Sequence, residues 1–248
     1  MFERFHKYAS LMHFHAFAQR WAAPLMWLAV VLLAAGLVGG LVLAPTDYQQ
    51  GESFRIMYVH VPSAWMSMFV YMTIAGAGIL GLVWKVKLGD VIARAAAPLG
   101  ASFTFLALVT GSLWGKPMWG TWWVWDARLT SELILLFLYL GYIALQNAIE
   151  DRRVAARAGA VLAVIGTVNI PIIHYSVMWW STLHQAASVS KMAKPSIHPT
   201  MLIPLLIMIA AFMCYFAAVL LVRVRCEILQ FDRNASWVRE LARGRSRA

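Results

Sequence analysis

Long apolar runs alternate with short polar segments along most of the chain, and this pattern predicts an all-α, polytopic membrane protein. Six runs are long enough, or nearly so, to cross about 30 Å of hydrocarbon as helices. They cover residues 24–43, 62–84, 93–113, 129–147, 158–175 and 201–222. Asn169 and Pro171 interrupt the fifth run, and a kink is expected there because Pro171 has no backbone N–H. Since no internal repeat and no separate soluble segment is visible, residues 1–248 are expected to form one transmembrane domain.

The Lys and Arg residues are distributed unevenly among the segments that flank and connect these runs. Of the 21 basic residues, 16 lie in the two tails and in the second-to-third and fourth-to-fifth connections, with their flanks. The other three connections are longer and share the remaining five: Arg55, Lys116, Arg128, Lys191 and Lys194. Cytoplasmic segments carry the excess of basic residues in membrane proteins. Both termini are therefore expected in the cytoplasm, and the three longer connections are expected on the outer face.

Composition supports a membrane protein and excludes several other classes. The chain is 61% hydrophobic and 13% charged, whereas a soluble domain has about 45–50% apolar and about 25% charged residues. The net charge of +10 lies mostly beside apolar runs, which favours contact with membrane lipid headgroups over nucleic acid. The chain contains neither a Cys-x-x-Cys-His motif nor a Gly-x-x-x-x-Gly-Lys-Ser/Thr loop. We therefore expect neither c-type haem attachment to this chain nor ATP hydrolysis by a phosphate-binding loop.

The middle outer connection, residues 114–128, is unusually rich in tryptophan. Its five indole rings are those of Trp114, Trp119, Trp122, Trp123 and Trp125. An aromatic belt at the membrane interface explains a single tryptophan at the end of a span. Five tryptophans in one segment, interleaved with glycine and proline, favour instead a stacking platform for a large, flat ligand.

Charged residues accompany this platform. Asp126 lies two residues before Arg128, and it either pairs with that cation or contacts the ligand. Arg128 and Arg55 are candidates to bind carboxylates of the ligand, because guanidinium pairs with carboxylate in bidentate fashion. Glu132 is expected in the first turn of the fourth span, where an acid complements the helix dipole.

Two histidines flank the tryptophan-rich connection in the predicted topology. His60 immediately precedes the second span, and His184 follows the fifth. A lone interfacial histidine is more often a hydrogen-bonded residue than a ligand. Two of them beside an aromatic platform favour the axial ligands of iron in a flat macrocycle. Zinc is disfavoured because the sequence lacks a local Cys/His cluster. His174 and His198 also fall on the outer side, without a predicted role.

Four segments resemble a known family. They are residues 114–128, Asp47-Tyr48-Gln49-Gln50-Gly51, Tyr58-Val59-His60-Val61-Pro62 and Asn169-Ile170-Pro171-Ile172-Ile173-His174-Tyr175-Ser176-Val177. Together they are similar to the haem-handling protein family of bacterial cytochrome c maturation, which carries a tryptophan-rich motif. The resemblance extends over essentially the whole chain, and only the two extreme ends match poorly.

The resemblance implies that the chain binds haem b at the periplasmic face of the bacterial inner membrane, with His60 and His184 as the axial ligands of the iron. It implies that the tryptophan-rich connection holds the haem and meets the haem chaperone CcmE, to which haem becomes covalently linked. It also implies a complex with the small membrane protein CcmD and with CcmA and CcmB, the ABC transporter that releases the loaded chaperone. Whether this chain promotes the covalent attachment, and so counts as an enzyme, is left open.

The residues by themselves leave two other functions open. A membrane cytochrome b electron carrier would bury haem between spans, with histidines inside the helices. The expected positions of His60 and His184, at or beyond span ends, disfavour that function. A permease for haem or a small solute would place ionisable residues or broken helices near the bilayer midplane. Only Asn169 and Pro171 point in that direction.

Overall fold

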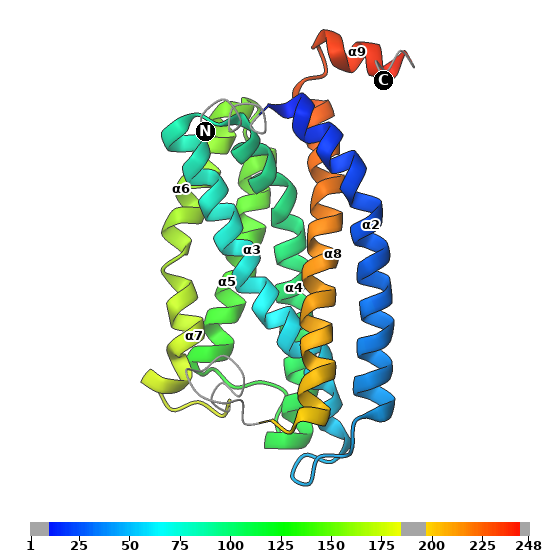
Figure 1. The fold of residues 1–248 in the computed structure, drawn as a ribbon. Helices are drawn as coiled ribbons and strands as arrows, with labels where there is room; N and C mark the ends of the chain where they lie inside the picture. The colour runs from blue at the N-terminus through cyan, green and yellow to red at the C-terminus, as the bar shows by residue number, and fades with distance from the viewer. Residues whose placement is uncertain (1–9, 185–196, 244–248) are drawn as a thin grey trace.

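The computed structural model describes residues 10–184 and 197–243 as a bundle of long helices (Figure 1), and these residues contain no β-strand. Six helical stretches within them are long and apolar enough to cross a membrane, which confirms the predicted number. The elements are α2 (Leu11–Leu37), the π-helical η1 (Val38–Leu43), the 3-10 helix η2 (Glu52–Ile56), α3 (Met57–Trp84), α4 (Lys87–Trp119), α5 (Ala127–Ala148), α6 (Arg152–Gly166), α7 (Asn169–Trp179), α8 (Pro199–Phe231) and α9 (Ser236–Ala242).

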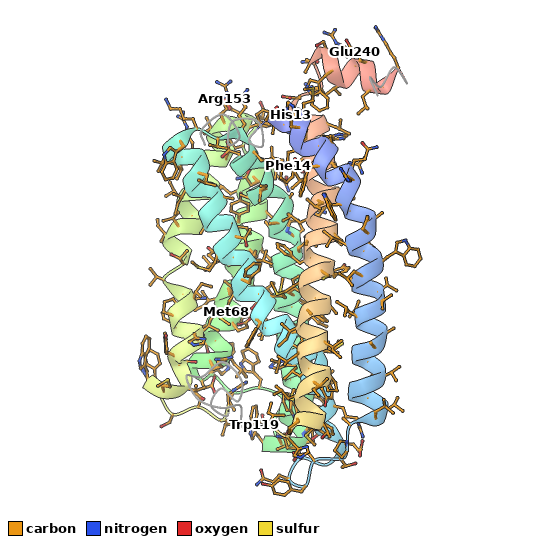
Figure 2. All side chains as sticks on the ribbon, in the orientation of Figure 1. His13, Phe14, Met68, Trp119, Arg153 and Glu240 are labelled. Atoms are coloured by element: carbon orange, nitrogen blue, oxygen red, sulfur yellow. The ribbon has the colours of Figure 1, made fainter. Side chains whose placement is uncertain are left out.

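The ends of the bundle differ in what they carry. Both ends of the described chain lie at one end of the bundle, and the described residues of the three longer connections lie at the other (Figure 1). Figure 2 labels Arg153 and Glu240 at the first end and Trp119 at the second. An even number of crossings requires this arrangement, and it places the predicted site segments at a single end.

Helix packing brings distant segments together along the bundle. The helix α2 packs along α8, α3 packs along α4, and α8 also contacts α3 and α4. The helix α5 packs against α4, α6 and α7. Tyr139 on α5 donates a hydrogen bond from its hydroxyl to the carbonyl oxygen of Ser67 on α3, at 2.6 Å. Its ring meets that of Tyr71 edge-on, with centroids 5.2 Å apart. Buried tyrosines therefore hold α3 and α5 together, while apolar side chains such as Trp27, 71% exposed, point outward as lipid-facing residues do.

The fifth predicted span is interrupted, as Pro171 suggested. The helix α6 ends at Gly166 and α7 begins at Asn169. Pro171 is the third residue of α7, where a helix has no internal acceptor for the backbone N–H, so its missing donor costs nothing there. The side-chain amide nitrogen of Asn169, Nδ2, donates to the backbone carbonyl oxygen of Ser131 on α5, at 2.8 Å. The side chain of Asn169, at the start of α7, thus links α7 to α5.

Two helices extend beyond the apolar runs that predicted them, and this changes the expected site. The helix α3 begins at Met57, so His60 lies inside its first turn and not ahead of the span, as we expected. The helix α4 runs on to Trp119, so the first part of the expected outer loop is helical. Its C-cap is Gly120, whose φ of 76° is the left-handed conformation that glycine adopts easily. An apolar run predicts only the part of a helix that lies in the hydrocarbon, whereas backbone hydrogen bonding continues the helix beyond that part.

Candidate functional site

The structure brings His60 and His184 together, although 123 residues separate them in the chain. Their imidazole rings have centroids 6.4 Å apart and are inclined by 36°. His60 comes from the first turn of α3, and His184 comes from the non-helical segment that follows α7. The role of the two histidines as iron ligands stays a prediction, but the two rings are close enough in space to act on one ligand.

Three residues of α4 surround the imidazole of His60, and we call them the His60 seat: Thr110, Gly111 and Trp114. The Nδ1 atom of His60 lies 3.1 Å from the hydroxyl oxygen of Thr110. The indole of Trp114 meets the imidazole edge-on, with centroids 5.7 Å apart. A Cβ atom on Gly111 would lie only 2.9 Å from Cε1 of the imidazole. The His60 ring therefore rests on α4 at a point where a side chain larger than glycine would displace it.

His184 lies beside a different tryptophan. Its ring is 6.2 Å from that of Trp119, the last residue of α4, and the two planes are inclined by 53°. The hydroxyl of Thr182 donates to the backbone carbonyl oxygen of His184, at 3.3 Å. Because residues 185–196 are outside the described part of the chain, His184 marks the last described position on this side of the site.

The five tryptophans have different surroundings. Trp114 and Trp119 lie on α4 beside the histidine pair. Trp123 and Trp125 pack edge-on against each other, with centroids 5.4 Å apart, and the side chain of Trp125 is 77% exposed. Trp122 is 52% exposed and has the ammonium group of a lysine 5.9 Å from its ring centre. Two of the predicted platform residues thus adjoin the histidines, whereas Trp122 and Trp125 are exposed and Trp123 is half-buried; the binding role of all five stays a prediction.

The acidic residues near the platform have structural positions that the sequence did not settle. Asp126 is the N-cap of α5, where Oδ1 accepts the backbone N–H of Leu129 at 2.8 Å. Among the described residues no salt bridge joins Asp126 to Arg128, but the two opposite charges still attract each other, so the carboxylate both caps α5 and faces this cation. Glu132 lies in the second turn of α5 and not in the first, as we expected, and its side chain is buried. Helix dipole complementarity therefore does not explain Glu132.

Both candidate cations already hold backbone carbonyl groups. Arg55 donates to the carbonyl oxygen of Gly40 in η1 at 2.8 Å and forms an ion pair with Glu52. Arg128 donates to the carbonyl oxygen of Ile173 on α7, also at 2.8 Å. A guanidinium has five N–H groups, so these bonds leave donors for an anionic ligand. Contact of either arginine with carboxylates stays a prediction.

The other two outer histidines have separate surroundings. The ring of His174 on α7 meets that of Tyr175 edge-on, with centroids 4.6 Å apart. His198 is the N-cap of α8, and its Nδ1 lies 2.8 Å from the hydroxyl of Thr200. Neither makes a ring contact with the His60–His184 pair among the described residues, so both are suitable controls for experiments on the pair.

Sequence reasoning missed several residues that shape the site. Thr110 and Gly111 belong to the expected third span and carried no visible signal. Gln50 was noted only as part of a motif, yet its Oε1 accepts the indole N–H of Trp114 at 3.0 Å. Reading residues 110–114 as one turn of helix would have placed Thr110 and Trp114 on a single face, but the glycine and proline that follow Trp114 suggested a loop.

The separation of the two ring centres agrees with that of two imidazoles bound to one iron. Metal–imidazole bonds measure about 2 Å, and each ring centre lies about 1 Å beyond its nitrogen, so trans ligands have ring centres about 6 Å apart. The observed separation of the His60 and His184 rings is 6.4 Å. Among the described residues no group of three or more His, Cys, Asp or Glu side chains is arranged to hold a metal ion. Two imidazoles with indoles beside them suit the iron of a haem, because the flat macrocycle supplies the other four ligands.

Comparison with known proteins gives matches over most of the chain. The sequence profile of the family described as heme exporter protein C matches residues 4–239. Heme exporter protein C of Haemophilus influenzae is 55% identical over 216 residues, which cover 87% of this chain and 88% of that protein. The protein of the same name from Escherichia coli K12 is 54% identical over 230 residues, 92% of each chain. That of Bradyrhizobium diazoefficiens is 56% identical over 212 residues, 84% of this chain and 80% of the relative.

Proposed function

The chain belongs to the heme exporter protein C family, and from this premise we propose that it binds haem b between His60 and His184 and passes it to the chaperone CcmE. Membership implies a role in haem export and cytochrome c maturation, carried out by a multi-pass protein of the bacterial inner membrane. The finer proposal is that haem binds at the periplasmic face, in a complex with CcmD and the transporter subunits CcmA and CcmB.

The observation that carries this proposal is the 6.4 Å separation of the two imidazole rings. It supports ligation of one iron by histidines from two different connections, with the haem as cargo between them. Trp114 and Trp119, which adjoin the pair, would pack against the macrocycle. Aromatic contacts of this kind contribute about 0.5–1.5 kcal/mol beyond their buried area.

The remaining predicted residues would serve the partners and the edge of the haem. The exposed rings of Trp122 and Trp125, with neighbouring Trp123, are proposed to meet CcmE. Asp126 caps the first turn of α5, directly after these rings in the chain, and is proposed to contact the chaperone or the haem with them. Arg128 and Arg55 are proposed to donate their remaining N–H groups to the haem propionates.

Handover requires exchange of iron ligands and exposure of one haem edge. The bond from the iron to one imidazole breaks as a donor from the chaperone takes its place, and no electron needs to move in that exchange. In the proposed arrangement a vinyl group of the haem faces the chaperone at the tryptophan surface. This chain supplies binding and presentation, while ATP hydrolysis belongs to the transporter.

The proposed compartment rests on the distribution of basic residues, because the end that carries the three longer connections is the poorer in Lys and Arg. Single cysteines at Tyr48 and Arg243, in a chain whose Cys214 and Cys226 are replaced by serine, would test it. Tyr48 is 91% exposed in the first long connection, and Arg243 is exposed at the opposite end. A membrane-impermeant thiol reagent added to cells with a permeabilised outer membrane should label the cysteine at 48 and not that at 243. The reverse result would place the site in the cytoplasm.

The ligand assignment is tested by absorption spectra of the purified chain. His60→Ala and His184→Ala should each change the Soret and visible bands, and the double variant should lose most of its haem. Added imidazole should partly restore each single variant, because it can occupy the vacated position. His174→Ala and His198→Ala should keep the wild-type spectrum. If His174→Ala abolished the spectrum while His184→Ala preserved it, the second ligand would be misassigned.

One observation favours the electron-carrier alternative more than the sequence did: His60 lies inside α3, as a histidine of a membrane cytochrome b does. His184, in contrast, lies outside a helix. Stoichiometric transfer of haem from the loaded chain to added CcmE separates the two functions. A chain that keeps its haem in the presence of CcmE and its partners, but exchanges electrons rapidly, would be a carrier.

A further inference from the structure

The hydroxyl group of Thr110 connects His60 to the backbone of α4. Its side chain is 9% exposed. The hydroxyl oxygen lies 2.6 Å from the carbonyl oxygen of Leu106, 3.3 Å from that of Ala107 and 3.1 Å from Nδ1 of His60. The imidazole also interacts with the backbone carbonyl group of Ala107, so two of its polar partners belong to α4.

The direction of these hydrogen bonds follows from what each group can donate. A carbonyl oxygen only accepts, so the single proton of the Thr110 hydroxyl points to Leu106, the closer carbonyl. The lone pairs of the hydroxyl oxygen then face His60. An unprotonated Nδ1 at 3.1 Å would set lone pair against lone pair, so Nδ1 must carry the proton. In a neutral imidazole the other nitrogen, Nε2, is then left with a free lone pair.

We propose that Thr110 is a positioning residue, which holds His60 in the tautomer that offers Nε2 to the haem iron. Metal-binding histidines generally donate their second ring N–H to a protein oxygen, which fixes the tautomer and orients the ring. Here that oxygen is the hydroxyl of Thr110, and the chain continues to the carbonyl of Leu106. This inference rests on the proposed function, because the role of His60 as a ligand is part of it.

The rest of the His60 seat supports a role in orientation and not only in packing. Gly111 lets the ring approach α4, since a Cβ there would lie 2.9 Å from Cε1 of His60. Trp114 lies one turn further along the same helix and meets the ring edge-on. A hydrogen bond, a close backbone approach and an indole together leave the imidazole one orientation. Such a ligand is in place before haem arrives, so less ordering is lost on binding.

The experiment compares three variants of the full-length chain in nanodiscs: Thr110→Val, Thr110→Ser and Thr104→Val. Valine keeps the shape of threonine without its hydroxyl, and serine keeps the hydroxyl. Thr104 is the matched control, because it is buried on the same helix and its hydroxyl donates to the carbonyl of Gly100 at 2.8 Å. No hydrogen bond joins it to a histidine among the described residues.

Haem titration gives the first measurement. Thr110→Val should bind haem about 10–100-fold more weakly, the usual effect of removing a partner of a metal-binding histidine. Thr110→Ser should bind close to the wild type, and Thr104→Val should match it. Equal affinity of Thr110→Val and the wild type would overturn the proposal. Weakening by Thr104→Val to the same extent would also overturn it, because the effect would then be one of helix packing.

The second measurement needs no haem. Solid-state NMR of the haem-free chain with ¹⁵N-labelled histidine rings, at about pH 8 where an ordinary imidazole is neutral, reports which ring nitrogen carries the proton. The His60 signal is the one that His60→Ala removes. Nδ1 should be protonated in the wild type and in Thr110→Ser, and the preference should be lost in Thr110→Val. A wild-type His60 protonated on Nε2 would overturn the proposal even if Thr110→Val failed to fold.

The two measurements separate this inference from the proposed function. If His60→Ala bound haem normally while Thr110→Val lost the tautomer preference, His60 would not be a ligand and the proposed function would fail, but the hydrogen bond would stand. If His60→Ala lost haem while Thr110→Val changed neither affinity nor tautomer, the proposed function would stand and the role of Thr110 would be refuted.

Discussion

His60 and His184 reach the same site from two different kinds of local structure. His60 lies in the first turn of α3, and three residues of α4 surround its ring. His184 lies in a non-helical segment, and its ring adjoins Trp119 at the last residue of α4. Groups on helices are held more precisely than groups on loops. If both histidines bind iron as proposed, we expect His60 to be the fixed ligand and His184 to be the ligand exchanged during handover.

The strongest test of His60 as a ligand is to fill the space that its imidazole ring occupies beside α4. Gly111→Val should abolish haem binding at concentrations that saturate the wild type, because a Cβ 2.9 Å from the imidazole of His60 forces the ring away. Haem titration with absorption spectra measures this. Gly141→Val is the matched control, since a Cβ at Gly141 meets no atom within 4 Å, and it should bind haem normally. A Gly111→Val chain with a wild-type spectrum would show that the His60 seat does not hold the ligand.

The split of the tryptophans predicts two different losses. Trp114→Ala with Trp119→Ala should weaken haem binding by roughly 5–150-fold, from two lost aromatic contacts of about 0.5–1.5 kcal/mol each. Trp122→Ala with Trp125→Ala should leave the haem spectrum unchanged and slow transfer to CcmE, because both of those rings are exposed. Titration and a transfer assay measure the two effects. If both double variants lost haem equally, the five rings would act as one platform after all.

Imidazole rescue compares the two ligand positions directly. In His60→Ala the vacated position is still lined by Thr110, which can accept the N–H of added imidazole, and by Trp114. We therefore expect half-restoration of the Soret band at a lower imidazole concentration in His60→Ala than in His184→Ala. Adding Thr110→Val to His60→Ala should raise the concentration required. Easier rescue of His184→Ala would reverse the assignment of fixed and exchanged ligand.

The smallest expected effect concerns the support of Trp114. Gln50→Leu removes the acceptor of the Trp114 indole N–H, at 3.0 Å, and a hydrogen bond of this kind contributes about 0.5–1.5 kcal/mol. Haem affinity should fall about 2–10-fold in the same titration. Gln49→Leu is the control. The side chain of Gln49 is exposed, so this substitution should leave haem affinity unchanged. Equal affinities for the two variants would mean that Trp114 keeps its place without Gln50.

Most of the fold could be predicted from the sequence because crossing a membrane is a local requirement. Each run of about 20 apolar residues meets it independently of its neighbours, which is why the six spans were found. Pro171 likewise marks the interruption of the fifth span locally, because proline has no backbone N–H. The placement of the three longer connections at one end follows from the number of crossings alone, and so does the placement of His60 and His184 on one side.

Contacts between distant segments decided the rest. The continuation of α4 to Trp119, against the glycine and proline in that stretch, accompanies the bond from Trp114 to Gln50 in another connection. The roles of Asp126 as a cap and of Glu132 as a buried acid depend on where α5 begins. Thr110 acquires its place beside His60 only because α3 packs along α4. The sequence by itself determined which residues lie in lipid and at which end the candidate ligands stand. Only the tertiary structure decided which side chains surround each ligand, since those neighbours are set by helix packing and not by the local pattern.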